Sequence, residues 1–375
     1  MIIEKIEMRD FRNYEKLELE LEPGVNVLMG RNAQGKTNLL EAIGYCSTGR
    51  SHRTSYDREC IRMGTSDAFI KLIFHNENEM LRPGAKPRSD SVELHLRRNG
   101  SKSAAINRVP VQKINDLFGC IRTVLFSPED LGLIKEGPSR RRRFMDMEIC
   151  QVDKVYLHYL QQYQIVLRQR NQLLKELVKA AKGVPSQVDR TLVEVYDDQF
   201  ADFACRLIAR RRVFLEKLGT LAPVIHSQIS GASEEIRFTY EMNVADNREM
   251  MIHKLADSFE SDLKQGSTSV GPHRDDIGIH INGIDVRTYG SQGQKRTAAL
   301  SMKLAEVEMM EKETGTSPVL LLDDVMSELD ESRQRFLVQS IEKHQTIITC
   351  TGVEDSIRRM QNARVFKVEE GTITI

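Results

Sequence analysis

Apolar and charged residues alternate near the start of the chain and again past its middle. At Lys16–Glu22, the residues Leu17, Leu19 and Leu21 stand between charged side chains, which is the period-2 pattern of a half-exposed strand. The same alternation returns at Ile236–Val244. Both parts of the chain are therefore predicted to form strands of a sheet. Shorter apolar runs predict further strands at 25–29, 68–75, 91–100, 318–324, 345–351 and 363–371.

Between these regions the apolar spacing changes to three and four residues, the period of an amphipathic helix. One apolar stripe starts near Asp153, Gly183–Ser186 interrupts it, and a second stripe follows. Two antiparallel helices joined by a Gly-Pro turn would form a helical hairpin, an arm of some reach. The first stripe comprises Val152, Tyr156, Tyr159, Tyr163, Val166, Leu173 and Leu177, and the second comprises Leu192, Val195, Phe203, Leu207, Phe214, Leu218 and Leu221.

These patterns predict an α/β head, a mixed sheet with flanking helices, that is interrupted by a mainly α-helical arm. We place the N-terminal part of the head at 1–144, the arm at 145–232 and the C-terminal part of the head at 233–375. Within the last part, Asn282-Gly283 predicts a hairpin turn between two apolar runs.

Composition narrows the class of protein without identifying a partner. Hydrophobic residues make up 40% of the chain and charged residues 29%, which is ordinary for a soluble globular protein. The first residues lack a secretory pattern, and the apolar run at Pro318–Leu322 is far too short to cross a bilayer. The six cysteines are scattered without paired spacing. We therefore expect a cytoplasmic protein with reduced thiols and no membrane segment.

The net charge is zero, with 54 basic and 54 acidic residues, so composition does not indicate a nucleic-acid partner. Positive charge gathers locally at Arg82–Arg88, Arg140–Arg143 and Arg210–Arg212. Each cluster by itself is more typical of a solvated face than of a DNA site.

The stretch GRNAQGKT, Gly30 to Thr37, matches the phosphate-binding loop pattern, with a predicted strand before it and a predicted helix after it. Glycines in such a loop let backbone N–H groups close around phosphates. Lys36 brings a positive charge to the β- and γ-phosphates, and the Thr37 hydroxyl is a ligand for Mg²⁺. ATP and Mg²⁺ are therefore the predicted cofactors, bound at Gly30, Arg31, Asn32, Ala33, Gln34, Gly35, Lys36 and Thr37.

The run PVLLLDD predicts a buried strand that ends in a carboxylate, Asp323. A P-loop protein needs a carboxylate there for the metal shell, so Thr37 and Asp323 are the candidate metal ligands. Asp324 is predicted to hold the attacking water, which makes Lys36 and Asp324 the candidate catalytic residues. The alternative is a surface-exposed acidic turn.

A second candidate anion-binding loop lies far downstream, where a Gly/Gln/Ser turn enters a predicted helix at Thr288–Leu300. Backbone N–H groups and the helix dipole favour an anion at such a position. Its GSQGQ stretch resembles the signature loop of ABC-type ATPases, and SELD at Ser327–Asp330 resembles their D-loop. In those ATPases the signature serine and glycine bind the γ-phosphate of ATP held by a different subunit. The resemblance implies an ATP-dependent homodimer. It places Ser291, Gly293 and Gln294 at the nucleotide, and Ser291, Gln292, Gly293 and Asp330 at the dimer interface.

A wider resemblance covers nearly the whole chain. Six stretches in order resemble the RecF family, bacterial DNA-repair and replication ATPases with an SMC-like head and a short arm. They are MRDFRNYEKLELELEPGVNVLMGRNAQGKTNLLEAI, LFSPEDLGLIKEGPSRRRRFMD, QRNQLLK, GPHRDD, SQGQKRT and LLLDDVMSELD. The resemblance implies an ABC/SMC-type P-loop ATPase head, in which Arg12 and Asn13 of the FRNY turn flank the nucleotide.

The resemblance also implies a function. RecF proteins dimerise on ATP and bind DNA with single-stranded gaps and junctions to double-stranded DNA. They act with RecO and RecR to load recombinase at gaps, and they support SOS induction and the maintenance of stalled replication forks. This chain is accordingly expected to be a weak, DNA-stimulated ATPase that serves as a switch, with hydrolysis resetting the dimer.

The chain departs from the wider ABC pattern in three places. Asp324 stands where ABC ATPases carry Glu, which retracts the carboxylate by roughly 1.5 Å, a bond length. Because misplacement on the order of 1 Å costs about 10²-fold in rate, we expect a slow ATPase. Where those enzymes place a His, this chain offers the hydroxyl of Thr349 or Thr351. No glutamine stands out in the loop before the arm, where Ser127–Asp130 lies.

The GPHRDD stretch, Gly271–Asp276, belongs to the RecF pattern without a role derived from its residues. His273, Asp275 and Asp276 suggest a metal site, but such a triad on a turn is more often a hydrogen-bonded structural clamp.

DNA binding is predicted for Arg140, Arg141, Arg142 and Arg143, which with Lys135, Arg168 and Arg170 would line a cleft between head and arm. No aromatic-rich base-reading motif is present, so sequence-specific binding is not expected. Two alternatives stay open. One is a P-loop clamp that holds a protein partner without touching DNA, and the other is a nucleotide or sugar kinase, which would not need the SQGQ stretch.

Overall fold

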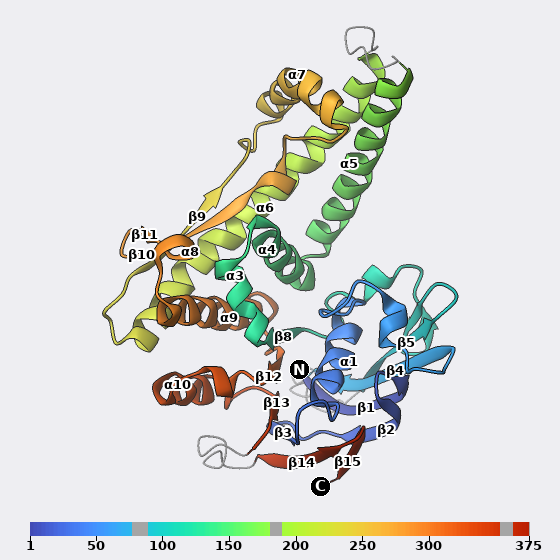
Figure 1. The fold of residues 1–375 in the computed structure, drawn as a ribbon, viewed down its shortest axis with the longest axis vertical. Helices are drawn as coiled ribbons and strands as arrows, with labels where there is room; N and C mark the ends of the chain where they lie inside the picture. The colour runs from blue at the N-terminus through green and yellow to red at the C-terminus, as the bar shows by residue number, and fades with distance from the viewer. Residues whose placement is uncertain (77–88, 181–189, 353–362, 375) are drawn as a thin grey trace, which may run out of the picture. The chain divides into compact units, whose positions relative to one another are not determined.

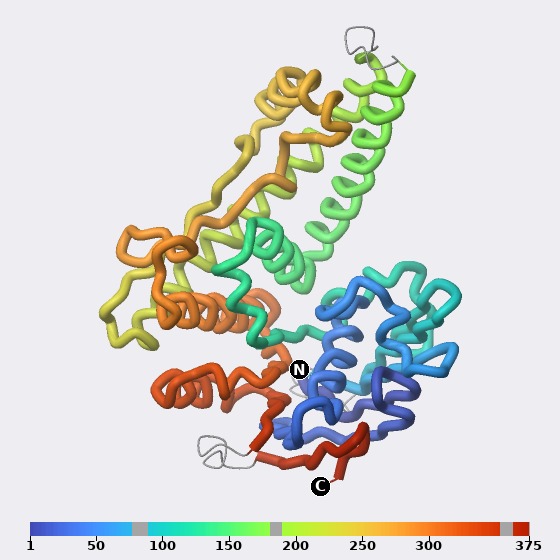
Figure 2. Tube along the Cα trace, viewed as in Figure 1, coloured from blue at the N-terminus to red at the C-terminus, as the bar shows by residue number. Residues whose placement is uncertain are grey.

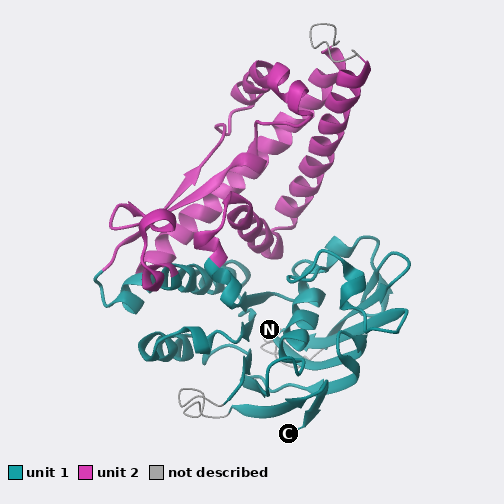
Figure 3. Cartoon of the chain, in the orientation of Figure 1, with its two compact units in different colours: residues 1–131, 225–233, 296–375 teal, residues 132–224, 234–295 magenta. Residues whose placement is uncertain are grey.

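The computed structural model describes residues 1–76, 89–180, 190–352 and 363–374, and Figure 1 shows their helices and strands. The trace in Figure 2 leads from the blue N-terminal strands through the green and yellow helices to the red C-terminal strands. Two compact units result: unit 1 comprises residues 1–131, 225–233 and 296–375, and unit 2 comprises 132–224 and 234–295 (Figure 3). The basic loop at 82–88 and the Gly-Pro turn at Gly183–Ser186 lie outside the described residues.

In the residues that the structure describes, unit 1 contains two six-stranded sheets together with α-helices. The first sheet contains β1 (Ile2–Phe11), β2 (Tyr14–Glu20), β4 (Asp67–His75), β5 (Asp90–Arg97), β6 (Ser103–Ile106) and β7 (Val109–Pro110). The second contains β3 (Val25–Met29), β8 (Thr123–Phe126), β12 (Val319–Asp323), β13 (Thr346–Cys350), β14 (Arg364–Glu369) and β15 (Thr372–Thr374). The helices are α1 (Lys36–Thr48), α10 (Glu331–Ile341) and α9 (Gln292–Thr314), whose first residues are assigned to unit 2.

The two sheets of unit 1 differ in strand direction. The first is antiparallel, in the order β2-β1-β4-β5-β6-β7. The second has the order β15-β14-β3-β13-β12-β8, and its strands from β14 to β8 run parallel. Side chains from both sheets and from α1 share one hydrophobic core, which includes Ile6, Leu28, Leu39, Ile43, Leu72, Leu94, Leu321 and Ile347. This core fixes α1, and therefore the loop before it, against the sheets.

Strand β2 confirms the alternation that the sequence shows at its start. Leu17 and Leu19 are buried, whereas Glu18 and Glu20 are exposed. The buried apolar run at Val25–Met29 forms β3, as predicted. The fold as a whole is the predicted mixed α/β head with flanking helices and a helical region in the middle of the chain.

Unit 2 is mainly helical. Its helices are α3 (Gly132–Lys135), α4 (Pro138–Val152), α5 (Lys154–Ala180), most of α6 (Thr191–Ser230), α7 (Arg248–Gln265) and α8 (Val286–Tyr289). A three-stranded antiparallel sheet in the order β11-β10-β9 completes it, formed by β9 (Ile236–Glu241), β10 (Asp276–Ile281) and β11 (Ile284–Asp285).

Helices α5 and α6 are the two predicted helices of the arm. The rings of Tyr163 and Phe200 lie 4.9 Å apart, and those of Tyr159 and Phe203 lie 6.4 Å apart. The earlier residue on α5, Tyr159, contacts the later residue on α6, Phe203, and Tyr163 contacts Phe200. The two helices therefore run antiparallel. The predicted turn at Asn282-Gly283 is confirmed as well, since β10 and β11 pair across it and both turn residues have positive φ.

Two features of unit 2 differ from the sequence analysis. The strands β9 to β11 form a small sheet of their own and do not join the sheets of unit 1. Helix α7 was not predicted, although Asn247 caps its first turn and Gly266 ends it in a left-handed conformation. The two units are therefore divided at other residues than the three predicted segments, whose assignment to head and arm stays a prediction.

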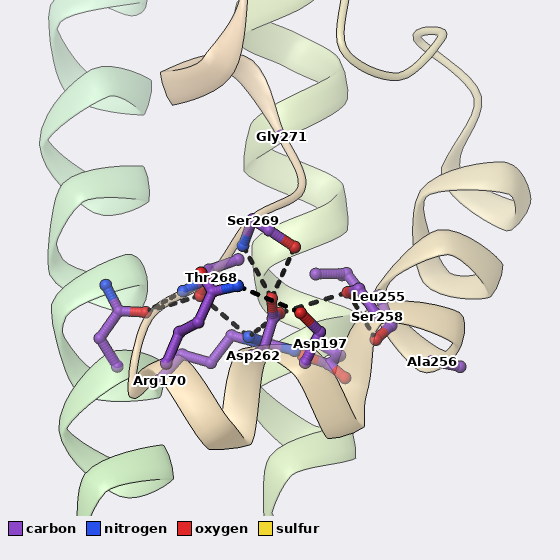
Figure 4. A network of polar contacts seen from close by, with 12 residues as sticks. Arg170, Asp197, Leu255, Ala256, Ser258, Asp262, Thr268, Ser269 and Gly271 are labelled. Carbon is purple, nitrogen blue, oxygen red and sulfur yellow. Dashed lines mark hydrogen bonds and ion pairs between the residues drawn. The ribbon is translucent and has the colours of Figure 1, made fainter.

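A buried ion-pair network joins α5, α6 and α7 inside unit 2 (Figure 4). Arg170 on α5 is fully buried, and its Nε donates to Asp197 on α6 at 2.5 Å. Its Nη1 donates to Asp262 on α7 at 3.0 Å and to the Thr268 hydroxyl at 2.9 Å. A cation between two carboxylates holds three helices at one point, at a depth where water does not screen the charges.

No helix in the described part of the chain combines the length and the apolar character that a membrane span requires.

Replacing Arg170 with Met is expected to lower the stability of unit 2 by about 3–5 kcal/mol, because Asp197 and Asp262 would lose their buried counterion. Hydrogen exchange of the α5 and α7 amides measures this change as an opening free energy. The matched control is Arg237→Met, which breaks an exposed pair with Glu235 and should change that free energy by less than about 1 kcal/mol. Equal effects of the two substitutions would contradict a stabilising role for the network.

Candidate functional site

The candidate nucleotide site lies where three neighbouring parallel strands of unit 1 end. The order β3-β13-β12 places the loop after β3, Thr349 near the end of β13, and Asp323 at the end of β12 along one edge of the sheet. Ligands of open parallel sheets bind at such carboxyl ends. The topology therefore brings together the two motifs of unit 1 that the sequence predicts for phosphate and metal.

The phosphate-binding loop turns tightly between β3 and α1. Gly35 has a φ of 116°, a conformation that favours glycine, and a Cβ atom there would lie 2.8 Å from the Asn13 side chain. A Cβ atom on Gly30 would lie 2.3 Å from the carbonyl oxygen of Val368. Both glycines are thus required by space, and they let the backbone of the loop face outward, with Arg31, Asn32 and Ala33 exposed.

Lys36 is the first residue of α1 and is largely buried. Its ammonium group donates to the carbonyl oxygens of Gly30, at 2.5 Å, and Arg31, at 2.9 Å, so the side chain curls back across the loop. Burial lowers the pKa of Lys36, and the carboxylates of Asp324 and Asp323 oppose that shift. The cation is therefore held inside the loop, where a bound phosphate would meet it.

Two hydroxyl groups converge on a single oxygen of Asp323. Thr37 and Thr349 each donate to Asp323 Oδ1 at 2.8 Å, one from α1 and the other from β13. The Thr349 hydroxyl also accepts from the backbone N–H of Asp324 at 2.9 Å. Thr349, which the sequence offered as a donor to the γ-phosphate, is 1% exposed, and its hydroxyl is already engaged with the Asp323 carboxylate and the Asp324 backbone. Thr351 is exposed.

Asp324 has a left-handed backbone, with a φ of 52°. Among the residues that the structure describes, no hydrogen-bond donor reaches its carboxylate, and the nearest organised contacts are made by its backbone. The side chain follows directly after the metal-ligand candidate Asp323. It is free to accept a proton or orient a water molecule.

The other end of the loop is held by the turn between β14 and β15, whose residues Glu370 and Gly371 were not among the predicted site residues. Gln34 accepts two hydrogen bonds from the turn between β14 and β15: Gly371 N–H donates to its carbonyl oxygen at 3.0 Å, and Glu370 N–H donates to its side-chain oxygen at 2.7 Å. Asn13 Nδ2 also donates to the Gln34 carbonyl, at 2.9 Å. The sequence offers only the glycine after two glutamates here, which is a turn signal and does not indicate a contact with the phosphate-binding loop.

Arg12 and Asn13 were both predicted to flank the nucleotide, but in the structure their side chains contact different parts of unit 1. Asn13 contacts the loop directly through Gln34 and accepts from Asn38 at 2.8 Å. Arg12 forms a bidentate ion pair with the buried Glu41 on α1, at 2.6 and 2.9 Å. Its guanidinium braces α1, and its place beside the nucleotide stays a prediction.

The candidate signature loop belongs to unit 2 and caps α9. The Ser291 hydroxyl accepts from the N–H of Gln294 at 3.1 Å, and the Gln294 side chain accepts from the N–H of Ser291 at 2.8 Å. This reciprocal pair is a capping box, which confirms that the turn enters a helix. Ser291 and Gln292 are exposed and Gly293 is half-buried. The loop therefore presents a helix N-terminus to its surroundings.

Asp330 of the predicted D-loop is also a helix cap. It accepts from the N–H of Arg333 at 3.0 Å and from the Ser332 hydroxyl at 2.7 Å, at the start of α10. These contacts account for its position in unit 1. Its place at a dimer interface stays a prediction.

The predicted DNA-binding residues must be corrected at two positions, one within the run Arg140–Arg143 and the other at Arg170. Arg141 is 2% exposed and forms a bidentate pair with Asp276, at 2.6 and 2.8 Å. Arg170 is buried between Asp197 and Asp262. A buried arginine with carboxylate partners is not available to a phosphate, so both are structural residues. Lys135, Arg143 and Arg168 are exposed, and Arg140 and Arg142 are half-buried.

The Gly271–Asp276 stretch is a hydrogen-bonded clamp, as the sequence analysis favoured over a metal site. His273 Nε2 donates to the Thr268 carbonyl at 2.9 Å, and its Nδ1 accepts from the Tyr163 hydroxyl at 2.6 Å. Asp275 accepts from the Tyr240 hydroxyl at 2.5 Å, and Asp276 is paired with Arg141. The three side chains thus point to different partners.

The donor set at Asp323 suits Mg²⁺. A threonine hydroxyl and a carboxylate oxygen in contact are hard oxygen ligands, which Mg²⁺ uses together with the phosphates of its substrate. In the described ranges, no group of three or more His, Cys, Asp or Glu side chains is placed to hold a metal ion. Mg²⁺ on a nucleotide needs only one or two protein ligands, because phosphates and water supply the others.

Comparison with known proteins agrees with this geometry. Residues 2–374 match the model of the RecF/RecN/SMC N-terminal domain. The SMC head domain of Pyrococcus furiosus with its coiled coil, at 17% identity and a TM-score of 0.56, covers 99% of this chain and 95% of its own. The fold and the site thus define an SMC-type P-loop ATPase head, as predicted.

Closer relatives identify the family. The DNA replication and repair protein RecF of Lachnoclostridium phytofermentans is 46% identical over 100% of this chain and 99% of its own. That of Clostridium tetani is 43% identical over 99% of each. A solved structure of the recombination mediator protein RecF-ATP of the RecFOR pathway has 38% identity and a TM-score of 0.89, covering 99% of this chain and 96% of its own. The chain belongs to the RecF family.

The stability of unit 2 is expected to depend on pH through His273. Burial lowers the pKa of His273 from 6.5 to about 4, so the folded protein keeps the imidazole neutral. Its contribution is present above pH 6.5 and is lost as the pH falls from 6.5 towards 4, because the unfolded chain then binds the extra proton. At pH 5 the loss is about 2 kcal/mol.

His273→Gln is the matched variant, since Gln keeps a donor and an acceptor but does not titrate. Hydrogen exchange of the α6 amides at pH 7.5 and pH 5 gives the opening free energy of each protein. The wild-type value should fall by about 2 kcal/mol more than that of the variant. An identical pH dependence of the two would show that His273 does not titrate in this range.

Proposed function

We propose that this chain is an ATP-dependent DNA-binding protein of bacterial recombinational repair, a switch that closes as a homodimer on ATP and is reset by slow hydrolysis. The main support is the contact of Thr37 with Asp323 at the edge of a P-loop sheet, in a chain that matches RecF proteins from end to end. The RecF whose solved structure this chain resembles carries ATP and belongs to the RecFOR pathway.

The nucleotide would bind at Gly30–Thr37. Exposed N–H groups of the loop and the ammonium of Lys36 would hold its phosphates, and Asn13 and Gln34 would keep the loop in shape. Thr37 and Asp323 would hold Mg²⁺, which neutralises charge on the phosphates when it is bound. Thr349, on β13 between β3 and β12, would hold the Asp323 carboxylate in position.

Asp324 would orient the attacking water. Its carboxylate has no hydrogen-bond partner in the described chain and lies close enough to Lys36 to influence the pKa of that side chain. The side chain is shorter than the Glu of ABC ATPases, so we expect hydrolysis to be slow. A slow step keeps the ATP-bound form long-lived, which suits a switch better than a metabolic catalyst.

The signature loop would complete the site of a second subunit. Ser291, Gly293 and Gln294 lie at the exposed start of α9, where backbone N–H groups and the helix dipole favour an anion. We infer that this anion is the γ-phosphate of ATP bound to the partner, with Gln292 and Asp330 at the same interface. ATP then joins the subunits and ADP does not, because only ATP carries the bridging group.

DNA would bind to the basic residues of unit 2 that remain exposed. Lys135, Arg143 and Arg168 are exposed in unit 2, and Arg140 is half-buried beside them in sequence. In a closed dimer two copies of this set would act together on the phosphate backbone of gapped, single-stranded or double-stranded DNA, without reading sequence. By family resemblance, RecO and RecR are the expected partners at gaps, with roles in SOS induction and fork maintenance.

A clamp that holds a protein partner stays as the second candidate. The burial of Arg141 and Arg170 favours it, because it removes two cations from the predicted DNA surface. Membership of the RecF family leaves no support for the kinase alternative.

Ser291→Arg is expected to abolish ATP-driven dimerisation while ATP binding to the monomer stays within about 2-fold, because the new side chain blocks the interface and not the loop at Gly30–Thr37. Light scattering with a non-hydrolysable ATP analogue measures the first, and a fluorescent nucleotide measures the second. Ser261→Arg, at an exposed serine of α7, is the matched control and should dimerise normally. A Ser291→Arg protein that still dimerises would refute the proposed role of the signature loop.

Salt dependence is expected to reveal the doubled DNA surface. Log affinity for a gapped duplex should fall with log salt by about 0.9 per phosphate contacted, and the slope should be steeper with ATP than with ADP. Arg143→Gln should reduce the slope with ATP, whereas Arg237→Gln, at an exposed arginine of β9, should not. Equal slopes with both nucleotides would argue against assembly by dimerisation, and no binding at all would favour the protein clamp.

A further inference from the structure

The Gly271–Asp276 motif belongs to a longer segment that crosses unit 2. We call Gly266–Asp276 the return segment, because it carries the chain from the end of α7 to the start of β10. From β10 the chain continues through β11 and α8 to the signature loop at Ser291. Only β10, β11 and α8 separate the return segment from the signature loop along the chain.

The first part of the return segment is fastened to the arm helices (Figure 4). Asp262 accepts from both the N–H and the hydroxyl of Ser269, at 2.9 and 2.6 Å. Thr268 accepts from Arg170 and donates twice to Asn171, at 2.7 Å each. The buried charges of α5 and α7 thus hold this stretch by side chain and by backbone.

The middle part is fastened through the backbone. The Gly271 N–H donates to the Asn243 side chain at 2.9 Å, and Arg211 on α6 donates to the Pro272 carbonyl at 2.7 Å. Gly271 has a φ of 119°, and a Cβ atom there would lie 2.7 Å from the Phe200 ring. This close approach explains why the motif begins with glycine.

The last part is fastened to α4, the helix of the basic run. The bidentate pair of Arg141 with Asp276 joins α4 to the first residue of β10. Arg142 donates to the carbonyl of Asp275 at 2.7 Å, one residue earlier. Arg141 also donates to the carbonyls of Leu133 and Glu136, both at 2.9 Å, so it ties α3 and α4 to the same point.

Helix α8, which leads into the signature loop, packs against α3 and β10. Both of these elements are tied to Arg141, directly by the Leu133 carbonyl in α3 and by Asp276 in β10. Helix α8, which directly precedes the signature loop, therefore packs against two elements that one buried arginine joins. Two neighbours of that arginine in sequence, Arg140 and Arg143, belong to the proposed DNA surface.

We propose that the Arg141–Asp276 pair is the fixed link between the DNA-contacting helix α4 and the signature loop, so that both act as positioning residues for Ser291. The proposal gives the motif its role: the pair sets the register of β10 on α4, and β10 sets the place of α8 and Ser291. It rests on the proposed function for the ligand that Ser291 meets and for the DNA contact of α4, but not for the link itself.

Asp276→Asn tests the link, because it keeps the shape of the side chain and removes the charge that Arg141 binds. In the nucleotide-free protein, hydrogen exchange of peptides covering 286–295 should become about 10-fold faster. ATP-driven dimerisation should weaken by about 10-fold, while ATP affinity of the monomer stays within about 2-fold. A residue with only a local structural role would loosen α4 and the start of β10 and leave 286–295 unchanged.

Three further variants complete the test. Asp202→Asn changes an exposed bidentate pair with Arg206 in the same unit, and it should behave as the wild type. Asp276→Glu keeps the charge and should restore most of the exchange protection and dimerisation. Arg141→Lys keeps a cation but loses the planar guanidinium that makes two hydrogen bonds to Asp276, so it should show the Asp276→Asn effects in milder form. It replaces Asp276→Asn as the test if that variant does not fold.

The hydrogen-exchange and dimerisation measurements distinguish the proposed link from the proposed function. Faster exchange at 286–295 in a protein whose wild type does not dimerise would support the link and refute the γ-phosphate role of Ser291. Unchanged exchange at 286–295, with a wild type that dimerises on ATP, would overturn the link and leave the proposed function standing. Failure of Asp276→Glu to restore protection would also overturn it.

Discussion

The candidate nucleotide site depends on one constraint, the parallel alignment of β3, β13 and β12. Parallel strands end at the same edge of a sheet. A loop, a threonine and a carboxylate that are far apart in sequence therefore lie together at that edge. The hydrogen bonds of Thr37 and Thr349 to one oxygen of Asp323 are the result. Strands β12 and β13 supply Asp323 and Thr349, and α1, which follows the loop after β3, supplies Thr37. The hydrophobic core shared by the sheets and α1 therefore keeps these polar groups in place.

Local signals predicted the parts of the structure in which neighbouring residues decide the conformation. The loop at Gly30–Thr37, the strand that ends at Asp323 and the Ser291 turn each carry their own pattern, and the structure shows the strand, turn or helix expected of each. Helix α7 has comparable signals in Asn247 and Gly266, but its apolar stripe is narrow, because the buried apolar residues recur only at every fourth position among polar and charged residues. Thr349 could not be found in this way, since its role exists only beside Asp323.

Charge runs were the least informative feature of the sequence, for a physical reason. The sequence does not distinguish an arginine that faces solvent from one that is paired with a buried carboxylate. Residues far away in the chain decide whether it is buried. Arg141 and Arg170 find Asp276 and Asp262, respectively 135 and 92 positions downstream. Unit 2 thus uses part of its positive charge as internal structure, which explains how a neutral chain can hold clustered arginines without presenting them all to a partner.

The left-handed backbone of Asp324 gives the departure from the ABC pattern a structural origin. Asp and Asn tolerate positive φ better than longer side chains, because their short polar groups bond locally. The turn after β12 therefore selects for a short carboxylate, whatever its reach. A longer side chain would bring the carboxylate forward but would suit this backbone conformation less well. The slow hydrolysis that we propose would then have its origin in the main-chain conformation at Asp324.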